Sequence, residues 1–592
     1  MQAQNLVICN VNHRKLGPIR DWSGANDVDG PWLIRHLKSM GANAIWFNPL
    51  TESTRIGYED PRKDNQKVSR SLYAERQHFR FSRELSAHPD PNASGVARSF
   101  LDRMHIKHFN AQMAEEGMLV FSDKVFNHVA RDNPIVQAET DEITALIRSC
   151  RERGLKWQYI VVDKHAEPQD QKPQVQPEFP DEDYQTKQII GISYGREGEK
   201  PSEYCFKFCR NRDFDALNYH GMPDYDTVQI NYASPQAYDF FVRGYQDGEN
   251  FVPGYWKQTI DRDIDLGFTG LRLDIAYKVP PHWLSELIQH AHDSKPGMVT
   301  IAETLAGVED VGARELIPRL ADVKIIVDGQ ERPGIDHAML SAPWLNLKDP
   351  HWFIDEVRQM QDISVYGGAG FPDNHDMETT IAQFASSLLE HDERPDKQPV
   401  IADICVRNYA IAALIGNAHY AQLGYELCAD QVGVHKEDTD PASWRRFMEE
   451  RPEGHPLNIA ARMRQINEFK QSLNAPDAIF ALQSVDWVGD NLARMNIALT
   501  DRETEEPVGT LELYLNNKPE CGPVYMPQVC YEDVRQERAG LKASFDATRA
   551  GEPVTAWKAI FRRDPAYAPH AHHTAEVENE AKSHQHAHAY HS

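Results

Sequence analysis

The chain is poor in the features that mark several large classes of protein. Its 592 residues contain only eight cysteines, and no repeated spacing among them suggests a zinc site or a disulfide framework. No apolar run approaches the length of a membrane span, and the first residues lack the basic region and long apolar core of a secretory signal. We therefore expect a cytoplasmic protein with no membrane partner.

Basic residues are also scarce relative to acidic ones. The sequence has 63 Lys and Arg against 89 Asp and Glu, a formal net charge of -26. Such a balance repels phosphate backbones and anionic membranes, so nucleic acid is not an expected partner, whereas an uncharged substrate carries no penalty. Hydrophobic residues at 41% and charged residues at 26% are typical of globular proteins, and the length predicts about two to four domains.

Apolar runs alternate with amphipathic stretches of helical period along most of the chain. The run 6–9 precedes a helical pattern around 32–40 and the run 44–47, and a helix predicted over 96–116 precedes a strand over 118–121. Strands separated by helices imply parallel crossovers and an α/β fold. Five further predicted strands lie at 270–273, 298–302, 324–327, 364–366 and 419–423. Together they make eight, which favours a closed (β/α)8 barrel over an open sheet.

Two changes of composition divide the chain. After the third strand, residues 131–222 are rich in Pro, Gln, Asp, Glu and Lys, which indicates an inserted domain between barrel parts at 1–130 and 223–474. Residues 475–565 change to short β-like runs, and we expect a small C-terminal β-sandwich there. Residues 566–592 are His-rich with few large apolar side chains, which predicts a disordered tail.

One predicted strand carries two charges that a buried strand rarely holds. Arg272 and Asp274 lie two residues apart in 270–280, so on a strand they point to the same side. A neighbouring guanidinium favours the ionised form of a carboxyl and lowers its pKa, as a nucleophile requires. If this stretch stood alone, a structural ion pair at a strand end would explain it better than a nucleophile.

Other strand ends carry ionisable groups as well. In a (β/α)8 barrel, reactive side chains gather at the carboxyl ends of the strands. The candidates are Asp123, Asn127 and His128 after the third strand, Arg272 and Asp274 in the fourth, Glu303 after the fifth, and Asn374, His375 and Asp376 after the seventh. Because all of them fall on one rim, we expect an active site there.

In this order, the four blocks resemble the four signature regions of the α-amylase family, glycoside hydrolase family 13. The matching residues are Asp123-x-Val125-x-Asn127-His128, Gly270-x-Arg272-x-Asp274, Glu303, and Asn374-His375-Asp376. Similar short motifs of the family are matched by 228–232, by the segment 71–74 that holds Tyr73, and by Gly424-Tyr425-Glu426. The resemblance covers the barrel, the insert as the family's B domain, and the C-terminal β domain.

The resemblance implies a role for each residue of the site. Asp274 is expected to be the nucleophile, Glu303 the general acid/base and Asp376 the carboxylate that stabilises the transition state. Retaining cleavage needs two carboxyl groups only about 5 Å apart, one ionised and one protonated. Arg272 is expected to keep Asp274 ionised, and burial near like charges to keep the proton on Glu303. The remaining residues expected to contact substrate are Tyr73, Asp123, His128, Lys278 and His375.

Two departures from the family pattern concern substrate specificity and the binding of a metal ion. Lys278, preceded by Tyr277, stands where the family often has a histidine four residues after the nucleophile, so a starch preference does not follow from the resemblance. Asn127 matches a position that binds structural calcium in many members. The insert has no loop with calcium-ligand spacing, so the resemblance leaves room for calcium at Asn127 and requires no cofactor.

The implied function is a retaining hydrolase or transglycosidase that acts on α-glucosidic bonds, α-1,4 above all, of maltodextrin-like oligosaccharides. A maltosyltransferase that uses maltose 1-phosphate is an alternative, because hydrolase and transferase share one covalent intermediate. A second alternative is a non-catalytic protein of the same fold, such as the barrel ectodomains that accompany amino-acid transporters. Those proteins have lost the catalytic acids, whereas Asp274, Glu303 and Asp376 are all present here.

Overall fold

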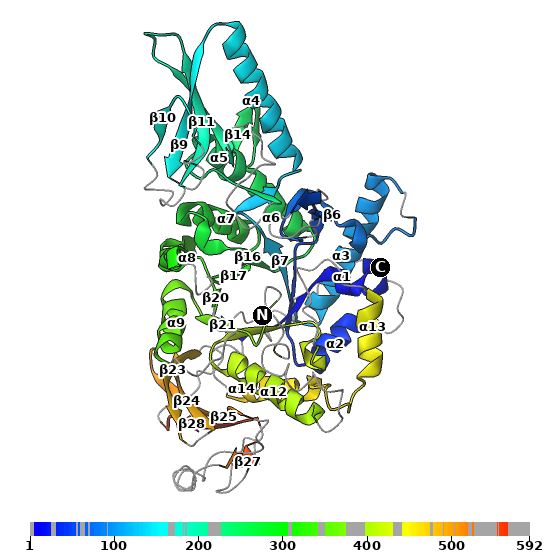
Figure 1. The fold of residues 1–592 in the computed structure, drawn as a ribbon. Helices are drawn as coiled ribbons and strands as arrows, with labels where there is room; N and C mark the ends of the chain where they lie inside the picture. Colours follow the sequence, from blue (N-terminus) through cyan, green and yellow to red (C-terminus); the bar gives the residue numbers. More distant parts are fainter. Residues whose placement is uncertain are drawn as a thin grey trace, which may run out of the picture.

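Eight parallel strands close into a barrel at the centre of the molecule, which confirms the predicted (β/α)8 architecture (Figure 1). In barrel order they are β1 (Val7–Val11), β2 (Ala44–Phe47), β7 (Leu119–Lys124), β16 (Gly270–Leu273), β17 (Val299–Ala302), β20 (His337–Met339), β21 (Gly368–Gly370) and β22 (Ala418–Gln422). Strand β22 pairs back onto β1 and closes the barrel.

This computed structural model describes the following parts of the chain: residues 5–24, 31–54, 57–59, 66–68, 71–90, 93–163, 172–180, 183, 186–210, 226–305, 311–340, 350–374, 380, 397–429, 441–473, 478–488, 491–502, 504–518, 524–525, 553–554 and 556–565. Among these residues, no helix is long and apolar enough to span a membrane.

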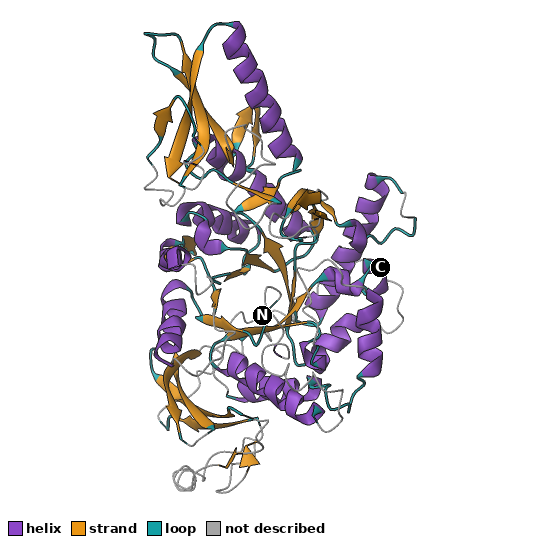
Figure 2. Ribbon diagram, viewed as in Figure 1, coloured by secondary structure: helices purple, strands orange, loops and turns teal. Residues whose placement is uncertain are grey.

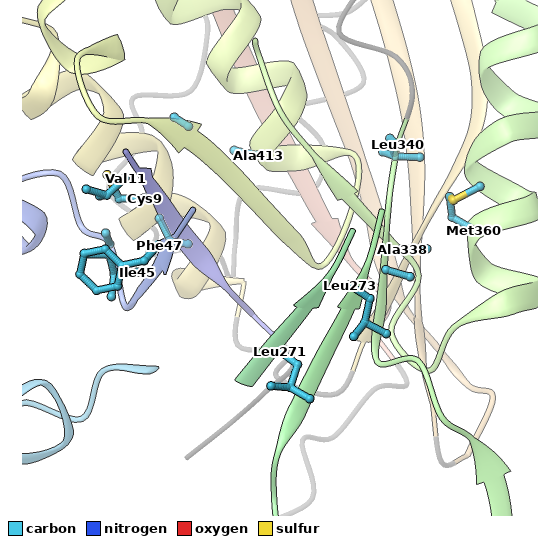
Figure 3. Close-up of a cluster of buried hydrophobic side chains, with 14 of the residues drawn as sticks. Cys9, Val11, Ile45, Phe47, Leu271, Leu273, Ala338, Leu340, Met360 and Ala413 are labelled. Carbon is cyan, nitrogen blue, oxygen red and sulfur yellow. The ribbon is translucent and has the colours of Figure 1, made fainter. Parts of the chain in front are cut away.

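Side chains alternate between the two faces of each barrel strand. Ile8, Trp46 and Phe121 belong to an inner cluster that fills the barrel. Outward-facing neighbours such as Cys9, Ile45, Phe47, Leu271 and Leu273 join the main hydrophobic core between strands and helices. Figure 3 shows part of this outer layer, with Met360 and Ala413 contributed by helices. The alternation places Arg272, between Leu271 and Leu273, on the inner face.

Helices cover the outside of the barrel (Figure 2). They are α2 (Trp32–Ser39), α3 (Gly95–Glu115), α6 (Tyr255–Asp265), α7 (Pro281–Ser294), α8 (Val311–Leu316), α9 (Pro350–Ile363), α12 (Gln398–Leu414), α13 (Pro441–Glu450) and α14 (Ala460–Ser472). Helix α12 is mostly apolar and buried from Ile404 onward, because it packs between barrel strands and the C-terminal sheet.

The expected sixth strand at 324–327 is wrong. It forms β18 (Lys324–Val327), which pairs antiparallel with β19 (Gln330–Pro333) outside the barrel. Asp328 and Gly329 both have positive φ, the geometry of an Asp-Gly hairpin turn. The true sixth strand is β20, whose three buried residues are too few to give a periodic signal.

The expected seventh strand at 364–366 lies four residues before the observed one. Strand β21 is Gly-Ala-Gly, a composition with low strand propensity. A Cβ on Gly370 would lie 2.4 Å from the carbonyl oxygen of Ala412 in α12, and one on Gly368 would meet the Leu340 side chain at 2.9 Å. The glycines are present because α12 and the neighbouring strand approach closely.

The insert leaves the barrel at the carboxyl end of β7 and forms its own sheet. After β8 (His128–Ala130), the long helix α4 (Pro134–Glu152) packs on an antiparallel sheet of order β10-β9-β11-β12. The strands are β9 (Lys156–Asp163), β10 (Gln174–Gln176), β11 (Lys187–Gly195) and β12 (Ser202–Arg210). Strand β13 (Thr227–Gln229) then pairs with β8 and returns the chain to the barrel. The expected domain boundary at 222 lies outside the described residues.

Short elements connect the main strands and helices of the barrel and the insert. They are α1 (His13–Leu16), β3 (Thr51–Ser53), β4 (Gly57–Glu59), β5 (Gln66–Val68), β6 (Glu75–Phe81), α5 (Pro235–Tyr238), β14 (Tyr245–Asp247), β15 (Asn250–Val252) and the 3-10 helix η5 (Ala276–Lys278). Strand β6 follows directly from Tyr73, so it connects the candidate site with the base of the insert.

The C-terminal part is antiparallel, as predicted. Four strands lie in the order β23 (Ala478–Trp487), β24 (Leu492–Asp501), β25 (Pro507–Asn516) and β28 (Trp557–Arg563), beside a small pair of β26 (Val524–Tyr525) and β27 (Pro553–Val554). Its packing as a sandwich stays a prediction. The tail 566–592 lies outside the described residues.

Candidate active site

Arg272 lies at the centre of the barrel, fully buried on the inner face of β16. Its guanidinium stacks over the ring of Trp46, 4.8 Å from the ring centroid, and lies 5.5 Å from the ring centroid of Tyr73. Both rings shield the cation from solvent and attract it through their π faces. A buried guanidinium also needs carboxylate partners, because an unpaired charge is expensive away from water.

Three carboxyl groups from three adjacent strand ends supply those partners. Arg272 Nη1 lies 2.9 Å from Asp123 Oδ1 and 2.7 Å from Asp274 Oδ1, and Nη2 lies 2.8 Å from Glu303 Oε2. The structure therefore brings together the acids that the sequence placed after the third, fourth and fifth strands. One guanidinium faces three acids, which makes their titrations interdependent.

Backbone hydrogen bonds hold the two expected catalytic acids in place. Asp274 and Glu303 each follow the last residue of a barrel strand. The Asp274 N–H donates to the Lys124 carbonyl at 2.9 Å, and the Glu303 N–H donates to the Leu273 carbonyl at 2.9 Å. The parallel ladder thus continues one residue beyond each strand, so both carboxyls project from a rigid frame.

The expectation that Arg272 keeps the pKa of Asp274 low is wrong for this geometry. Burial, reinforced by the charge of Glu303, raises the pKa of Asp274 well above its usual range, and Arg272 only partly opposes the effect. Burial alone would lower the pKa of Arg272. The charges of the surrounding acids outweigh burial and raise this pKa above its ordinary range, so the guanidinium stays charged. The cluster consequently holds a proton more readily than isolated carboxyls do.

Asp123 is enclosed by donors on both oxygens. Its Oδ1 accepts from Arg272, and its Oδ2 accepts from Trp46 Nε1 and from the Tyr73 hydroxyl, each at 2.9 Å. The side chain has no exposed surface. These contacts fit a positioning role behind Arg272 better than the expected contact with substrate.

Asp274 has one oxygen bound and one open. Arg272 Nη1 donates to Oδ1, while Oδ2 is buried and has no hydrogen-bond partner among the described residues. A buried carboxylate oxygen without a hydrogen-bond donor lowers the stability of the folded state. Its presence here therefore indicates a role other than folding stability. Oδ2 is the oxygen available to attack a substrate atom.

Ile275, directly after Asp274, has an unusual backbone conformation. Its φ of 43° and ψ of 45° lie in the left-handed region, which costs a branched residue roughly 1–2 kcal/mol. In this conformation its N–H donates to Glu303 Oε2 at 2.7 Å. Strained backbone of this kind concentrates at functional sites, where the surrounding structure imposes it.

Tyr277 and Lys278 continue this turn as part of η5. The hydroxyl of the buried Tyr277 donates a hydrogen bond to the Leu305 carbonyl at 3.3 Å. This bond connects the turn to the segment that follows Glu303. Lys278 is half-buried, with Nζ 6.0 Å from the Tyr277 ring centroid. Its contact with substrate stays a prediction.

Tyr73 is held by its hydroxyl rather than left free to move. It donates to Asp123 and accepts from Asn48 Nδ2 at 2.7 Å, and Asn10 Nδ2 in turn donates to Asn48 Oδ1 at 3.2 Å. The chain of hydrogen bonds runs from β1 across β2 to the candidate site. It fixes the orientation of the Tyr73 ring beside Arg272.

Among the described residues, those around Asn127 do not fit a calcium site. The Asn127 side-chain oxygen accepts from the Tyr232 hydroxyl at 3.1 Å, and its Nδ2 lies 3.4 Å from Nδ1 of the buried His128. Calcium takes six to eight oxygen ligands, usually with several carboxylates. Within the described part of the chain, no group of three or more His, Cys, Asp or Glu side chains is placed to hold a metal.

The last expected site residues, His375 and Asp376, lie outside the described residues. The residues just before them are well held. Asp373 Oδ2 accepts from the Thr380 N–H at 2.8 Å, and the buried Asn374 offers its carbonyl to Gln422 Nε2 at 2.7 Å. Burial raises the pKa of Asp373 to about 6. The segment that carries Asp376 therefore starts from a fixed point at the end of β21.

Among solved structures, an α-amylase from Lactobacillus plantarum is similar over 94% of this chain and 98% of its own, with a TM-score of 0.51 and 13% identity. The fold is that of an α-amylase. The ligand-free cyclic α-maltosyl-(1→6)-maltose hydrolase from Arthrobacter globiformis gives a TM-score of 0.51 at 11% identity, covering 95% of this chain and 98% of the hydrolase. No protein-family model and no curated protein matches the sequence.

The α-amylase fold places two residues in the site that the sequence did not single out. Trp46 is hidden in the apolar strand Ala44–Phe47, and Asn48 follows it. Their position could have been found from alternation, because Ile45 and Phe47 face the outer core and Trp46 must face inward. Nothing in the local sequence connects Tyr232 with Asn127.

Proposed function

We propose that this chain is a member of the α-amylase family and a retaining glycosidase or transglycosidase. The observation that carries the proposal is the attachment of Asp274 and Glu303 to the two ends of one guanidinium, at 2.7 Å and 2.8 Å. Retention needs two carboxyls about 5–5.5 Å apart. Two acids on neighbouring nitrogens of one guanidinium are an arrangement compatible with such a separation.

The reaction follows from the positions of the two acids. Glu303 donates its proton to the glycosidic oxygen as the bond from that oxygen to the anomeric carbon breaks, and the bonding pair stays on the oxygen. Asp274 Oδ2, the oxygen with no donor among the described residues, forms a bond to the anomeric carbon. Glu303 then takes a proton from water or a sugar hydroxyl, which attacks the same carbon and releases Asp274.

The raised pKa of Asp274 bears on this division of labour, because by itself it favours a proton on the nucleophile. Burial and the nearby charge of Glu303 raise the pKa of Asp274, so these neighbouring carboxyls favour a state with one proton between them. Catalysis requires that proton on Glu303. Arg272, which keeps its charge, contacts both acids and stabilises whichever of them is ionised.

The other expected roles are part of the proposal. Asp376 would stabilise the transition state, and His128 and His375 would bind sugar hydroxyls. Tyr73 would stack on the sugar ring beside Arg272, and Lys278 would face the leaving group. Asp123 is assigned to position Arg272, because its own oxygens are fully occupied.

The proposed substrates are uncharged α-linked gluco-oligosaccharides of the maltodextrin type, cleaved or transferred at α-1,4 bonds. The formal charge of -26 carries no penalty for such a substrate. We also propose a cytoplasmic location, which agrees with six free cysteines among the described residues: Cys9, Cys150, Cys205, Cys209, Cys405 and Cys428.

The test is product analysis after incubation with maltoheptaose. The parent should release shorter maltodextrins, and products longer than the substrate would assign transfer in addition to hydrolysis. Glu303→Gln should lower kcat by about 10²- to 10⁴-fold, since general acid catalysis contributes that much. Glu286→Gln, on the outer helix α7, is the control and should keep parental activity. Parental turnover by Glu303→Gln would refute the acid/base assignment.

A further inference from the structure

The turn after Asp274 places a backbone donor against the second acid. Ile275 adopts its left-handed conformation between Asp274 and η5, and the turn is closed by the Lys278 N–H, which donates to the Ile275 carbonyl at 2.9 Å. Tyr277 fixes the same turn to Leu305 beyond Glu303. Both ends of the turn are therefore anchored, and the Ile275 N–H has a fixed direction.

That N–H makes a directed hydrogen bond to Glu303. The distance from Ile275 N to Glu303 Oε2 is 2.7 Å. Arg272 Nη2 lies at 2.8 Å from the same oxygen, but this contact is an ion pair whose N–H does not point at the carboxylate. The backbone of Ile275 is thus a group that orients the carboxyl of Glu303.

We infer that Ile275 is a positioning residue. Its amide N–H keeps Oε2 of Glu303 as a hydrogen-bond acceptor, so the proton that Glu303 transfers lies on Oε1. A donor N–H favours the carboxyl oxygen with more negative charge, and a proton on Oε2 would remove that charge. The assignment rests on the proposed function, because it names the oxygen that protonates the leaving group. It explains why a branched residue is held at φ 43° beside the nucleophile.

Replacing residue 275 by its α-hydroxy acid analogue tests the inference. This substitution exchanges the N–H for an ester oxygen and keeps the isoleucine side chain. Loss of a donor to the ionised form favours the protonated form, so the alkaline limb of the kcat/KM profile should move up by about one pH unit. Arg272 and Asp274 from β16 and Asp123 from β7, the charged groups in this cluster, remain unchanged.

Ile326 provides a matched control. Its backbone N–H also donates to a side-chain oxygen, Gln289 Oε1 at 2.6 Å, in the hairpin outside the barrel. The same analogue at 326 should leave the pH profile at its parental position. Ile275→Gly keeps both the N–H and access to the left-handed region, so it should also keep the parental profile. An unshifted profile in the 275 ester would overturn the inference.

A spectroscopic readout separates this inference from the proposed function. The carbonyl stretch of protonated Glu303, isolated as the infrared difference between parent and Glu303→Gln, should persist to higher pH in the 275 ester than in the 326 ester. This shift requires no turnover. A protein without activity on maltoheptaose would refute the proposed function, whereas identical titrations in the two esters would refute the positioning role of Ile275.

Discussion

At the scale of single residues, the site concentrates charge that a folded protein normally avoids. Arg272 is fully buried, and its partners Asp123, Asp274 and Glu303 are nearly so. Deleting one partner of a buried ion pair typically costs 3–5 kcal/mol, because the other charge is left uncompensated. Here the cation has three partners, so the loss of any one acid leaves it paired. We expect the cluster to be retained for chemistry rather than for stability.

A second buried acid gives a test of the electrostatics near the site. Glu75 accepts from the Thr51 hydroxyl, and burial raises its pKa to about 7. An acid with a raised pKa stabilises the folded state at low pH, and this contribution is lost as the pH rises through about 7. The glutamine of Glu75→Gln has no charge to bury. The free energy of unfolding of this variant, relative to the parent, should therefore increase by about 2–3 kcal/mol between pH 5 and pH 8.

Denaturant unfolding at several pH values measures this difference. Glu286→Gln is the control of opposite sign, because hydrogen bonds from Lys257 and Tyr238 outweigh burial and lower the pKa of Glu286. That variant should lose stability relative to the parent as the pH rises through the acid range. A pH-independent difference for Glu75→Gln would show that Glu75 is ionised in the folded state.

Part of the site could be predicted from local spacing. Two residues on one strand face the same side, so the contact between Arg272 and Asp274 followed from the sequence. The raised pKa of Asp274 did not, because it comes first from burial in the folded barrel and then from the charge of Glu303, which arrives from another strand and outweighs that of Arg272. The Ile275 conformation was also out of reach, since a branched residue has no local preference for positive φ.

At the scale of elements, the barrel depends on close approach between strand β21 and helix α12. A Cβ on Gly370 would lie 2.4 Å from a backbone oxygen of α12, and neither partner can move alone. We expect Gly370→Ala to lower the free energy of unfolding by about 1–3 kcal/mol, the usual cost of overpacking a core.

Gly95 is the matched control for this substitution. It begins helix α3, and an added Cβ would meet nothing within 4 Å. Gly95→Ala should therefore be neutral or stabilise the protein by up to about 1 kcal/mol, because alanine favours the helix. Denaturant unfolding of both variants measures the contrast. Equal effects would show that β21 and α12 are less tightly packed than described.

Strand prediction failed at the sixth and seventh strands of the barrel, β20 and β21. The apolar run 324–327 has a stronger strand signal than the true sixth and seventh strands, yet it forms an exposed hairpin with Ile326 58% exposed. The Asp328-Gly329 dipeptide is typical of a hairpin turn and is the signal that could have identified one here. Strands β20 and β21 have three residues each and are strands because the barrel around them is closed, which is a tertiary effect.

At the scale of the whole molecule, the insert rises from the barrel beside the candidate site (Figure 1). It is held to its own helix by a fully buried ion pair, Arg210 Nη2 with Glu139 Oε2 at 2.8 Å. Arg210→Met would leave the buried Glu139 without its close ion-pair partner and with only the more distant Lys207, so we expect the insert to lose about 3–5 kcal/mol of stability.

Limited proteolysis within the insert measures this loss, because cleavage reports local opening. Lys207→Met is the control, since Lys207 lies 3.6 Å from the same carboxylate, is partly exposed and leaves Arg210 in place. Cleavage should accelerate strongly in Arg210→Met and little in Lys207→Met. Equal rates in the two variants would mean that the buried pair does not hold the insert together.

The proposed function requires that Asp274 form a covalent bond with the sugar. The most direct measurement is mass spectrometry of the protein after treatment with an α-glucosyl fluoride that carries a second fluorine at ring carbon 5, which slows release of the intermediate. We predict one glycosyl adduct, on the proteolytic peptide that contains Asp274, and none in Asp274→Ala. An adduct on a different residue, or steady fluoride release with inversion at the anomeric carbon, would contradict the account.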